Sequence, residues 1–292
     1  MSQRRIRKPI ILLGAGRSGT SLLGNFLASH PDIAYLGEPR PIWMYGNAYR
    51  PDHVLDASHL TPQIADYIDR HFWEFLDRSG RSRFAEKTPS NCLRIPFIHA
   101  LYPDCRMVNV LRNGLEVVRS TVSIRQRPAN PGTIRKRLRT TPWWEWPSYM
   151  PAFWSGYVRP RLLRRPARFW GARPPNWKEW RELPPHLSCA HQWKSLVEIS
   201  LVEAARVPPE NYLQIRYEDV VVDPAGICDG IADFAELPRS EEMRRAALER
   251  IKPGHAHRRM SELTPRQEEE VMEIIGPLQE RLGYPSRPGV NR

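Results

Sequence analysis

The sequence predicts an α/β fold: a P-loop-like, three-layer α/β/α arrangement around a central, mainly parallel sheet. Three observations lead to this prediction. A short apolar run at 9–13 is followed by a glycine-rich turn and the start of a helix. Two further runs that read as strands, at 106–111 and 212–217, are each followed by a helical pattern. Repeated strand-then-helix units are typical of parallel sheets, which bind ligands at the carboxyl ends of their strands.

The glycine-rich turn has the spacing of a phosphate-binding loop with one change. Gly14, Gly19 and Ser21 are in register with the pattern G-x-x-x-x-G-K-[ST], but Thr20 stands where that pattern has lysine. The cation lies inside the loop instead, at Arg17. A guanidinium binds a tetrahedral oxyanion through paired hydrogen bonds, and the first amides of the following helix are further donors. The turn therefore predicts a site for a phosphate-like ester rather than for magnesium–ATP.

Apolar residues at strand or helix spacing continue the alternation along the chain. The expected segments are a strand at 9–13, a helix from 20 to about 30, an extended piece at 33–36, a helix at 60–79, a strand and turn at 83–89, a helix at 95–101, a strand at 106–111, a helix through 117–121, a helix at 191–201, a strand at 212–217, a helix through 227–234 and a helix at 265–282. The glycine turn, Lys87 and Arg112 then follow strands of one parallel sheet, so we expect all three at the same edge.

Residues 126–188 interrupt this alternation because proline, tryptophan and arginine dominate there. We interpret the chain as a single domain, 1–292, in which 126–188 is an insertion that forms a lid or a substrate cleft. Aromatic rings between basic residues could stack on sugars or bases, or lie at a membrane interface. The same residues could equally pack their tryptophans on the main domain.

The chain of 292 residues has a net charge of +12, and its isoelectric point is near 9.9. A net positive charge of this size suits binding to a highly anionic ligand, a nucleic acid or an anionic membrane surface. It is also compatible with basic residues that are simply exposed to solvent. The four cysteines are far apart, which predicts no metal framework and a reducing compartment. No apolar stretch is long enough to span a membrane. We therefore expect a cytoplasmic protein, with peripheral membrane contact as a further option.

Taken together, these segments resemble the PAPS-dependent sulfotransferases, which transfer a sulfuryl group from 3′-phosphoadenosine 5′-phosphosulfate (PAPS) to an acceptor and release the bisphosphate PAP. The resemblance covers most of the chain outside the insertion. It implies a 5′-phosphosulfate loop formed by Gly16, Arg17, Ser18, Gly19, Thr20 and Ser21. Arg112 and Ser120, eight positions apart, look like the pair that holds the 3′-phosphate.

Two further segments support the resemblance. Tyr217, within Arg216-Tyr217-Glu218-Asp219, resembles a family tyrosine that lies near the adenosine. The basic segment 252–259 is similar in position to a loop that closes over the 3′-phosphate, which implies contacts from Arg258 and Arg259. That segment departs from the family's glycine–tryptophan pattern, so the resemblance does not assign which of its residues touches the ligand.

The resemblance also suggests a catalytic base. The phenol and steroid enzymes carry K-T-H, but this chain has Lys87-Thr88-Pro89. Glycan and protein-tyrosine sulfotransferases use a glutamate shortly after the first helix, and Glu38 in G-E-P-R occupies that place. The resemblance is therefore closer to this second branch, with Glu38 as general base, Lys87 and Arg17 stabilising the transition state, and Arg40 orienting Glu38 or the substrate. Lesser candidates for the base are His191, His255 and His257.

The chain has two separated cationic sites, at Arg17 and at Arg112. Two such sites suit a nucleotide that carries anionic groups at both ends. If cations stabilise the leaving phosphate, no metal is needed. The first alternative is a P-loop kinase or NTPase, which the missing lysine disfavours. The second is a basic nucleic-acid or membrane-surface module, which leaves the glycine turn and Arg112 unexplained. The acceptor hydroxyl could belong to a sugar, a lipid or a natural product, and no nucleic acid is expected beyond the nucleotide donor.

Overall fold

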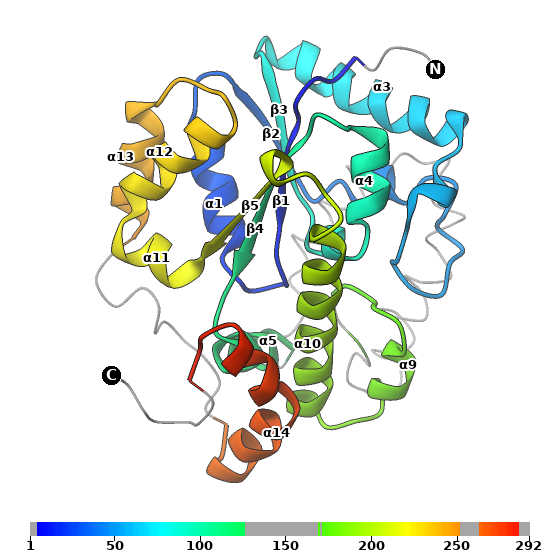
Figure 1. The fold of residues 1–292 in the computed structure, drawn as a ribbon, viewed down its shortest axis with the longest axis vertical. Coiled ribbons are helices and arrows are strands. Elements are labelled where there is room, and N and C mark those ends of the chain that lie inside the picture. Colours follow the sequence, from blue (N-terminus) through cyan, green and yellow to red (C-terminus); the bar gives the residue numbers. More distant parts are fainter. Residues whose placement is uncertain (1–4, 126–168, 170, 252–262, 286–292) are drawn as a thin grey trace, which may run out of the picture.

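The computed structural model describes residues 5–125, 169, 171–251 and 263–285 (Figure 1). The expectations for Arg258, Arg259, His255 and His257, and for most of the 126–188 insertion, therefore lie outside the described residues. The strands are β1 Ile10–Leu13, β2 Ile33–Gly37, β3 Arg83–Lys87, β4 Arg106–Leu111 and β5 Tyr212–Arg216. They form one sheet in the order β2-β3-β1-β4-β5, and every neighbouring pair is parallel.

Helices connect these strands in the order expected for a parallel sheet. They are α1 Thr20–Leu27, α2 Arg40–Trp43, α3 Pro62–Ser79, α4 Ile95–Leu101, α5 Gly114–Arg125, α9 Trp177–Trp180, α10 Pro185–Ala204, α11 Tyr217–Val222, α12 Pro224–Phe234, α13 Glu241–Arg250 and α14 Pro265–Arg281. Short 3₁₀ turns are η1 Ala57–His59, η2 Pro89–Leu93 and η5 Pro209–Asn211.

Two hydrophobic cores lie on opposite faces of the sheet and confirm the three-layer prediction. On one face, Ile11 and Leu13 of β1 belong to the larger core, together with residues of α3, α4, α5, α10 and α14. On the other face, Ile10 and Leu12 pack with residues of α1, α12 and α13. Successive strand residues point to opposite faces, so a strand buried on both sides is apolar throughout. This explains why β1 reads as a continuous apolar run. Figure 1 shows α1, α12 and α13 on one side of the strands and α3, α4 and α10 on the other.

The short helices α2 and α11 have no counterpart in the sequence expectation, and two longer helices also differ from it. Helix α10 begins at Pro185, six residues before the predicted start, because its first turns bury His186, Ser188 and Cys189 rather than large apolar residues. Helix α13 was not predicted at all. It buries only Met243 and Ala247, so its pattern is almost entirely polar, although Ser240 caps its N-terminus by accepting a hydrogen bond from the backbone of residue 243.

The register of the sheet brings the ends of its central strands to one edge. Leu12 of β1 lies opposite Lys87 of β3 and Val108 of β4, and Gly37 at the end of β2 also lies opposite Lys87. The segments that follow β1, β2, β3 and β4 therefore leave the sheet at the same side. Among the helices that the structure describes, none is long and apolar enough to cross a membrane.

Candidate active site

The glycine-rich turn between β1 and α1 packs so closely on its neighbours that two positions require glycine. Gly14 has φ +144° and Gly19 has φ +98°. A Cβ on Gly14 would lie 2.8 Å from the carbonyl oxygen of Val110, and one on Gly19 would lie 2.3 Å from Cδ2 of Tyr217. The backbone N–H of Gly14 donates to Sγ of Cys92 in η2 at 3.1 Å. The turn is thus held between β4, α11 and η2.

Arg17 connects this turn to the start of α5. Its Nε donates to Oγ of Ser120 at 3.1 Å, and its backbone carbonyl accepts from Nη1 of Arg112 at 3.2 Å. Arg17 has φ +76°, a left-handed conformation that is uncommon for a residue with a side chain. The structure therefore brings the predicted 5′ loop and the predicted 3′-phosphate pair side by side. Along the same turn, Ser18 and Thr20 are buried, Gly16 and Gly19 are partly buried, and Arg17 and Ser21 are exposed.

The guanidinium of Arg112 is fixed from two directions. Its Nε and Nη2 lie 3.2 and 2.7 Å from Oε2 of Glu116, one helical turn further along α5. Its Cζ also lies 4.2 Å from the ring centroid of Tyr217, as in a cation–π contact. Burial raises the pKa of the Tyr217 hydroxyl, so the tyrosine stays neutral beside the arginine. Sequence reasoning missed Glu116, which lies in the first turn of α5, four residues after Arg112.

Glu38 lies between two cations at the end of β2. Its Oε1 accepts a 2.7 Å hydrogen bond from Nζ of Lys87, and its Oε2 lies 3.1 Å from Nη2 of Arg40. The Lys87 side chain is 5% exposed and that of Glu38 is 38% exposed, so the carboxylate faces solvent while the ammonium is buried. The structure therefore brings Glu38, Lys87 and Arg40 together.

The backbone of Glu38 is strained and held in place. Its φ is +56°, a left-handed conformation that costs a glutamate of order 1 kcal/mol or more. Its N–H donates to the carbonyl of Lys87 at 2.8 Å, and its carbonyl accepts from the N–H of Arg40 at 2.8 Å. Strain of this kind is kept where the surrounding structure fixes it, and it is frequent at active sites.

Glu86, which sequence reasoning missed, organises the segment after β3. Its side chain is fully buried on the face of the sheet opposite Lys87. It accepts hydrogen bonds from Oγ1 of Thr88 at 2.8 Å and from Nδ2 of Asn91. Burial raises the pKa of Glu86 to about 7. A charged residue within the run R-F-A-E-K was the available signal. Because Cys92 of η2 in turn contacts Gly14, this carboxyl supports both the Lys87 turn and the glycine loop.

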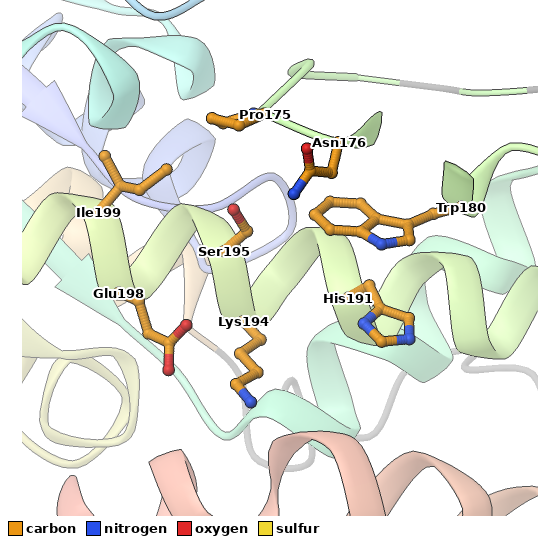
Figure 2. Close-up of a pocket in the computed structure, with 8 residues that line it drawn as sticks. All are labelled: Pro175, Asn176, Trp180, His191, Lys194, Ser195, Glu198 and Ile199. Carbon is orange, nitrogen blue, oxygen red and sulfur yellow. The ribbon is translucent and has the colours of Figure 1, made fainter. Parts of the chain in front are cut away.

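His191 lies in a different environment from Glu38. It lines a pocket between α9 and α10, where its ring stacks on Trp180 with centroids 5.4 Å apart (Figure 2). Desolvation and then the charge of Lys194 lower the pKa of His191. Trp180 belongs to the described end of the 126–188 insertion, so this part of the insertion docks on α10. Within the described residues, no group of three or more His, Cys, Asp or Glu side chains is placed to hold a metal ion.

Comparison with known proteins supports the family resemblance that the sequence motifs indicate. The model of the sulfotransferase family matches residues 9–152 and 160–241. Nodulation protein NoeE of Sinorhizobium fredii (strain NBRC 101917 / NGR234) is 29% identical over 127 residues, which cover 38% of this chain and 30% of that protein. A putative protein-tyrosine sulfotransferase of Caenorhabditis briggsae is 28% identical over 120 residues, which cover 39% of this chain and 42% of that protein. The matched segments thus span less than half of these two relatives.

Solved structures share the fold. The sulfotransferase domain from the curacin biosynthetic pathway superposes with a TM-score of 0.53 at 15% identity, over 96% of this chain and 99% of that domain. At this level of identity the likeness concerns the fold alone. The family match covers most of the chain, from β1 to the start of α13, and the chain therefore belongs to the sulfotransferase family.

Proposed function

We propose that the protein transfers a sulfuryl group from PAPS to an acceptor hydroxyl. The observation that carries this proposal is the contact of Arg17 with both Ser120 and Arg112, because it joins two anion-binding segments into one continuous site. A nucleotide with a single phosphate cluster would need one of these segments. PAPS carries anions at both its 5′ and 3′ ends and suits both.

The residues around the glycine-rich turn fit the chemistry of this donor. Arg17 and the amides at the start of α1 offer donors to the 5′-phosphosulfate, and Arg112 with Ser120 offers donors to the 3′-phosphate. The Tyr217 ring, which packs on Gly19 and Arg112, offers an aromatic face near the adenosine. Outside the described residues, Arg258 and Arg259 remain candidates for a further contact with the 3′-phosphate.

The donor supplies the sulfuryl group and a phosphate leaving group. In the proposed reaction, Glu38 removes the proton of the acceptor hydroxyl as the oxygen attacks sulfur in line. The new S–O bond forms as the S–O bond to the phosphate breaks, and the electron pair of the broken bond remains on the phosphate. Lys87 and Arg17 stabilise the negative charge that develops there. Arg40 holds the Glu38 carboxylate through its second oxygen.

A transfer assay with ³⁵S-labelled PAPS tests the proposal. The acceptors are sugars, lipids and phenolic natural products, and the buffer contains EDTA. We expect label transfer to at least one class without added metal, and a large loss of turnover in Glu38→Gln. If Glu38→Gln keeps wild-type turnover, Glu38 is not the base. If magnesium–ATP is turned over and PAP does not bind, the protein is a phosphotransferase instead.

Pro89 at the place of the K-T-H histidine, together with Glu38 shortly after the first helix, favours the branch that contains glycan and protein-tyrosine sulfotransferases. Within that branch we propose a sugar, lipid or natural-product hydroxyl as the acceptor. Peripheral contact with a membrane would bring a lipid acceptor within reach, and flotation of the protein with anionic vesicles measures that contact directly. Binding to nucleic acid that is not displaced by PAP would favour the nucleic-acid module instead.

A further inference from the structure

A group of arginines adjoins Glu38 that the donor site does not use. Three segments meet there, as their backbones show. The N–H of His53 donates to the carbonyl of Arg173 at 2.8 Å, and the N–H of Leu55 donates to the carbonyl of Leu93 in η2 at 3.1 Å. The segment at 53–55 therefore connects the segment before α9 to the turn that follows Lys87. We call Arg40, Arg94 and Arg173, with His53 between them, the arginine cluster.

Arg173 is held in this cluster by uncharged groups. Its Nε lies 3.2 Å from Nε2 of His53, and its Cζ lies 5.4 Å from the ring centroid of Trp177. Desolvation, followed by the charges of Arg94, Arg173 and Arg40, holds the pKa of His53 well below its usual value. The imidazole is therefore neutral and does not offset the positive charge of Arg173.

Three carboxyl groups act on the cluster: Glu38 at Arg40, Asp52 near Arg173, and the buried Glu86, which the charge of Arg94 reaches. Glu38 contacts Arg40 through Nη2, and Arg40 Nε is buried without a hydrogen-bond partner within the described part of the chain. Arg50, three residues before His53 in the chain, also has a buried Nε with no partner among the described residues. Asp52 is the acid whose charge raises the pKa of Arg173, against the larger effect of burial and the opposing charge of Arg40. Burying cations in this way is costly unless an anion completes the site.

By composition, the rest of the insertion adds far more positive than negative charge. By sequence, residues 126–168 contain ten lysines and arginines and one acidic residue, Glu145. The donor's 3′-phosphate does not account for the cluster either. Arg40 follows β2, whereas Arg112 follows β4, three strands away in the order β2-β3-β1-β4. At about 4.8 Å per strand, the two positions are roughly 14 Å apart.

We infer that the acceptor is itself an anion, and that Arg40 and Arg173 bind a carboxylate, sulfate or phosphate group on it beside the hydroxyl that Glu38 activates. This inference rests on the proposed function, because it assigns the substrate class of the same site. The planar fork of arginine suits these oxyanions through paired hydrogen bonds. An acidic sugar or an already sulfated glycan has the required chemistry, whereas a neutral sugar, a neutral lipid or a simple phenol does not.

Matched probe pairs test the inference by titration calorimetry on protein saturated with PAP. The pairs are 4-nitrophenyl β-D-glucuronide with 4-nitrophenyl β-D-glucoside, and the 6-sulfate and 6-phosphate of N-acetylglucosamine with the parent sugar. We compare the wild type with Arg173→Gln. Arg181→Gln is the matched control, because Arg181 lies just after α9 and its ion pair with Glu182 is on the surface. Arg173→Lys keeps the charge but loses the fork, and thermal unfolding checks that each variant folds.

We expect at least one anionic probe to bind about tenfold or more tightly than its neutral partner in the wild type and in Arg181→Gln. Arg173→Gln should lose that preference, and Arg173→Lys should recover part of it. Equal affinities within every pair, or an unchanged preference in Arg173→Gln, would overturn the inference. PAP affinity and ³⁵S transfer are measured separately. If the protein neither binds PAP nor transfers ³⁵S but still prefers the anionic probes, the proposed function is rejected and the anion site is not.

Discussion

Nζ of Lys87 donates a 2.7 Å hydrogen bond to Oε1 of Glu38. The proposed base and the proposed transition-state cation therefore touch each other at the ends of two neighbouring strands, β2 and β3. This pairing fixes one carboxylate oxygen of Glu38 against the Lys87 ammonium, while the second oxygen is held by Arg40. It also links the acceptor side of the site to the donor side, because η2 follows Lys87 directly and contacts the glycine loop through Cys92.

Replacing Glu38 with glutamine should reduce kcat by about 10² to 10⁴-fold, because a neutral amide cannot take the acceptor proton. PAP affinity should stay within about threefold of the wild type, since Glu38 contacts Lys87 and Arg40 rather than the donor-binding residues. Steady-state kinetics and calorimetry measure the two effects. Glu74→Gln, at a partly exposed position of α3, is a charge-matched control. A variant that lost PAP binding and turnover together would assign Glu38 to the donor site instead.

Gly19→Ala should destabilise the protein more than Gly80→Ala, although both glycines have positive φ. At Gly80 a Cβ meets nothing within 4 Å, so the cost is the backbone strain of about 1 kcal/mol. At Gly19 the Cβ collides with the Tyr217 ring, and overpacking adds about 1–3 kcal/mol. Urea unfolding measures the difference. PAP affinity should fall in Gly19→Ala alone. Equal loss of stability in the two variants would show that the Tyr217 contact is not tight.

Glu86→Gln should change how stability depends on pH. Burial raises the pKa of Glu86 to about 7, above the value of 4.5 in an unfolded chain. Between these values the folded protein binds more protons than the unfolded chain, so this group makes the wild type less stable as pH rises from about 4.5 to 7. The loss amounts to roughly 3 kcal/mol, and the glutamine should remove it.

Urea unfolding of both proteins at pH 5.0 and pH 8.0 measures this effect. The difference in the free energy of unfolding, Glu86→Gln minus wild type, should be larger at pH 8.0 than at pH 5.0. Thr88→Ser, which keeps the hydroxyl that donates to Glu86, should retain the wild-type pH dependence. Parallel pH profiles for Glu86→Gln and the wild type would mean that Glu86 is ionised in the folded protein.

Much of this fold could be predicted from the sequence because its signals are local. The apolar run of β1, the glycines of the turn and the helical spacing of α1 lie within 18 residues, Ile10–Leu27, and each depends on near neighbours. The proximity of Arg112 to the turn also followed from the rule that parallel strands end at one edge. Polar elements such as α13 gave no apolar pattern and were missed.

The remaining features of the site depend on contacts between distant segments. His53 and Arg173 are 120 residues apart in the chain, and Gly14 and Cys92 are 78 apart. No spacing rule connects such positions, so the arginine cluster and the Cys92 contact could not be derived from the sequence. The burial of Glu86 could not be predicted for a different reason. A single acid in a short strand looks like a solvent-facing residue until the helices that cover it are placed.

The central claim is that one nucleotide is bound at both ends, by the glycine loop and by Arg112. Calorimetric titration of the wild type and Arg112→Ala with PAP and with adenosine 5′-phosphate, which lacks the 3′-phosphate, tests it most directly. We predict that the wild type binds PAP at least about tenfold more tightly than adenosine 5′-phosphate, and that Arg112→Ala binds the two nucleotides equally. Equal affinities in the wild type, or an undiminished preference for PAP in Arg112→Ala, would contradict it.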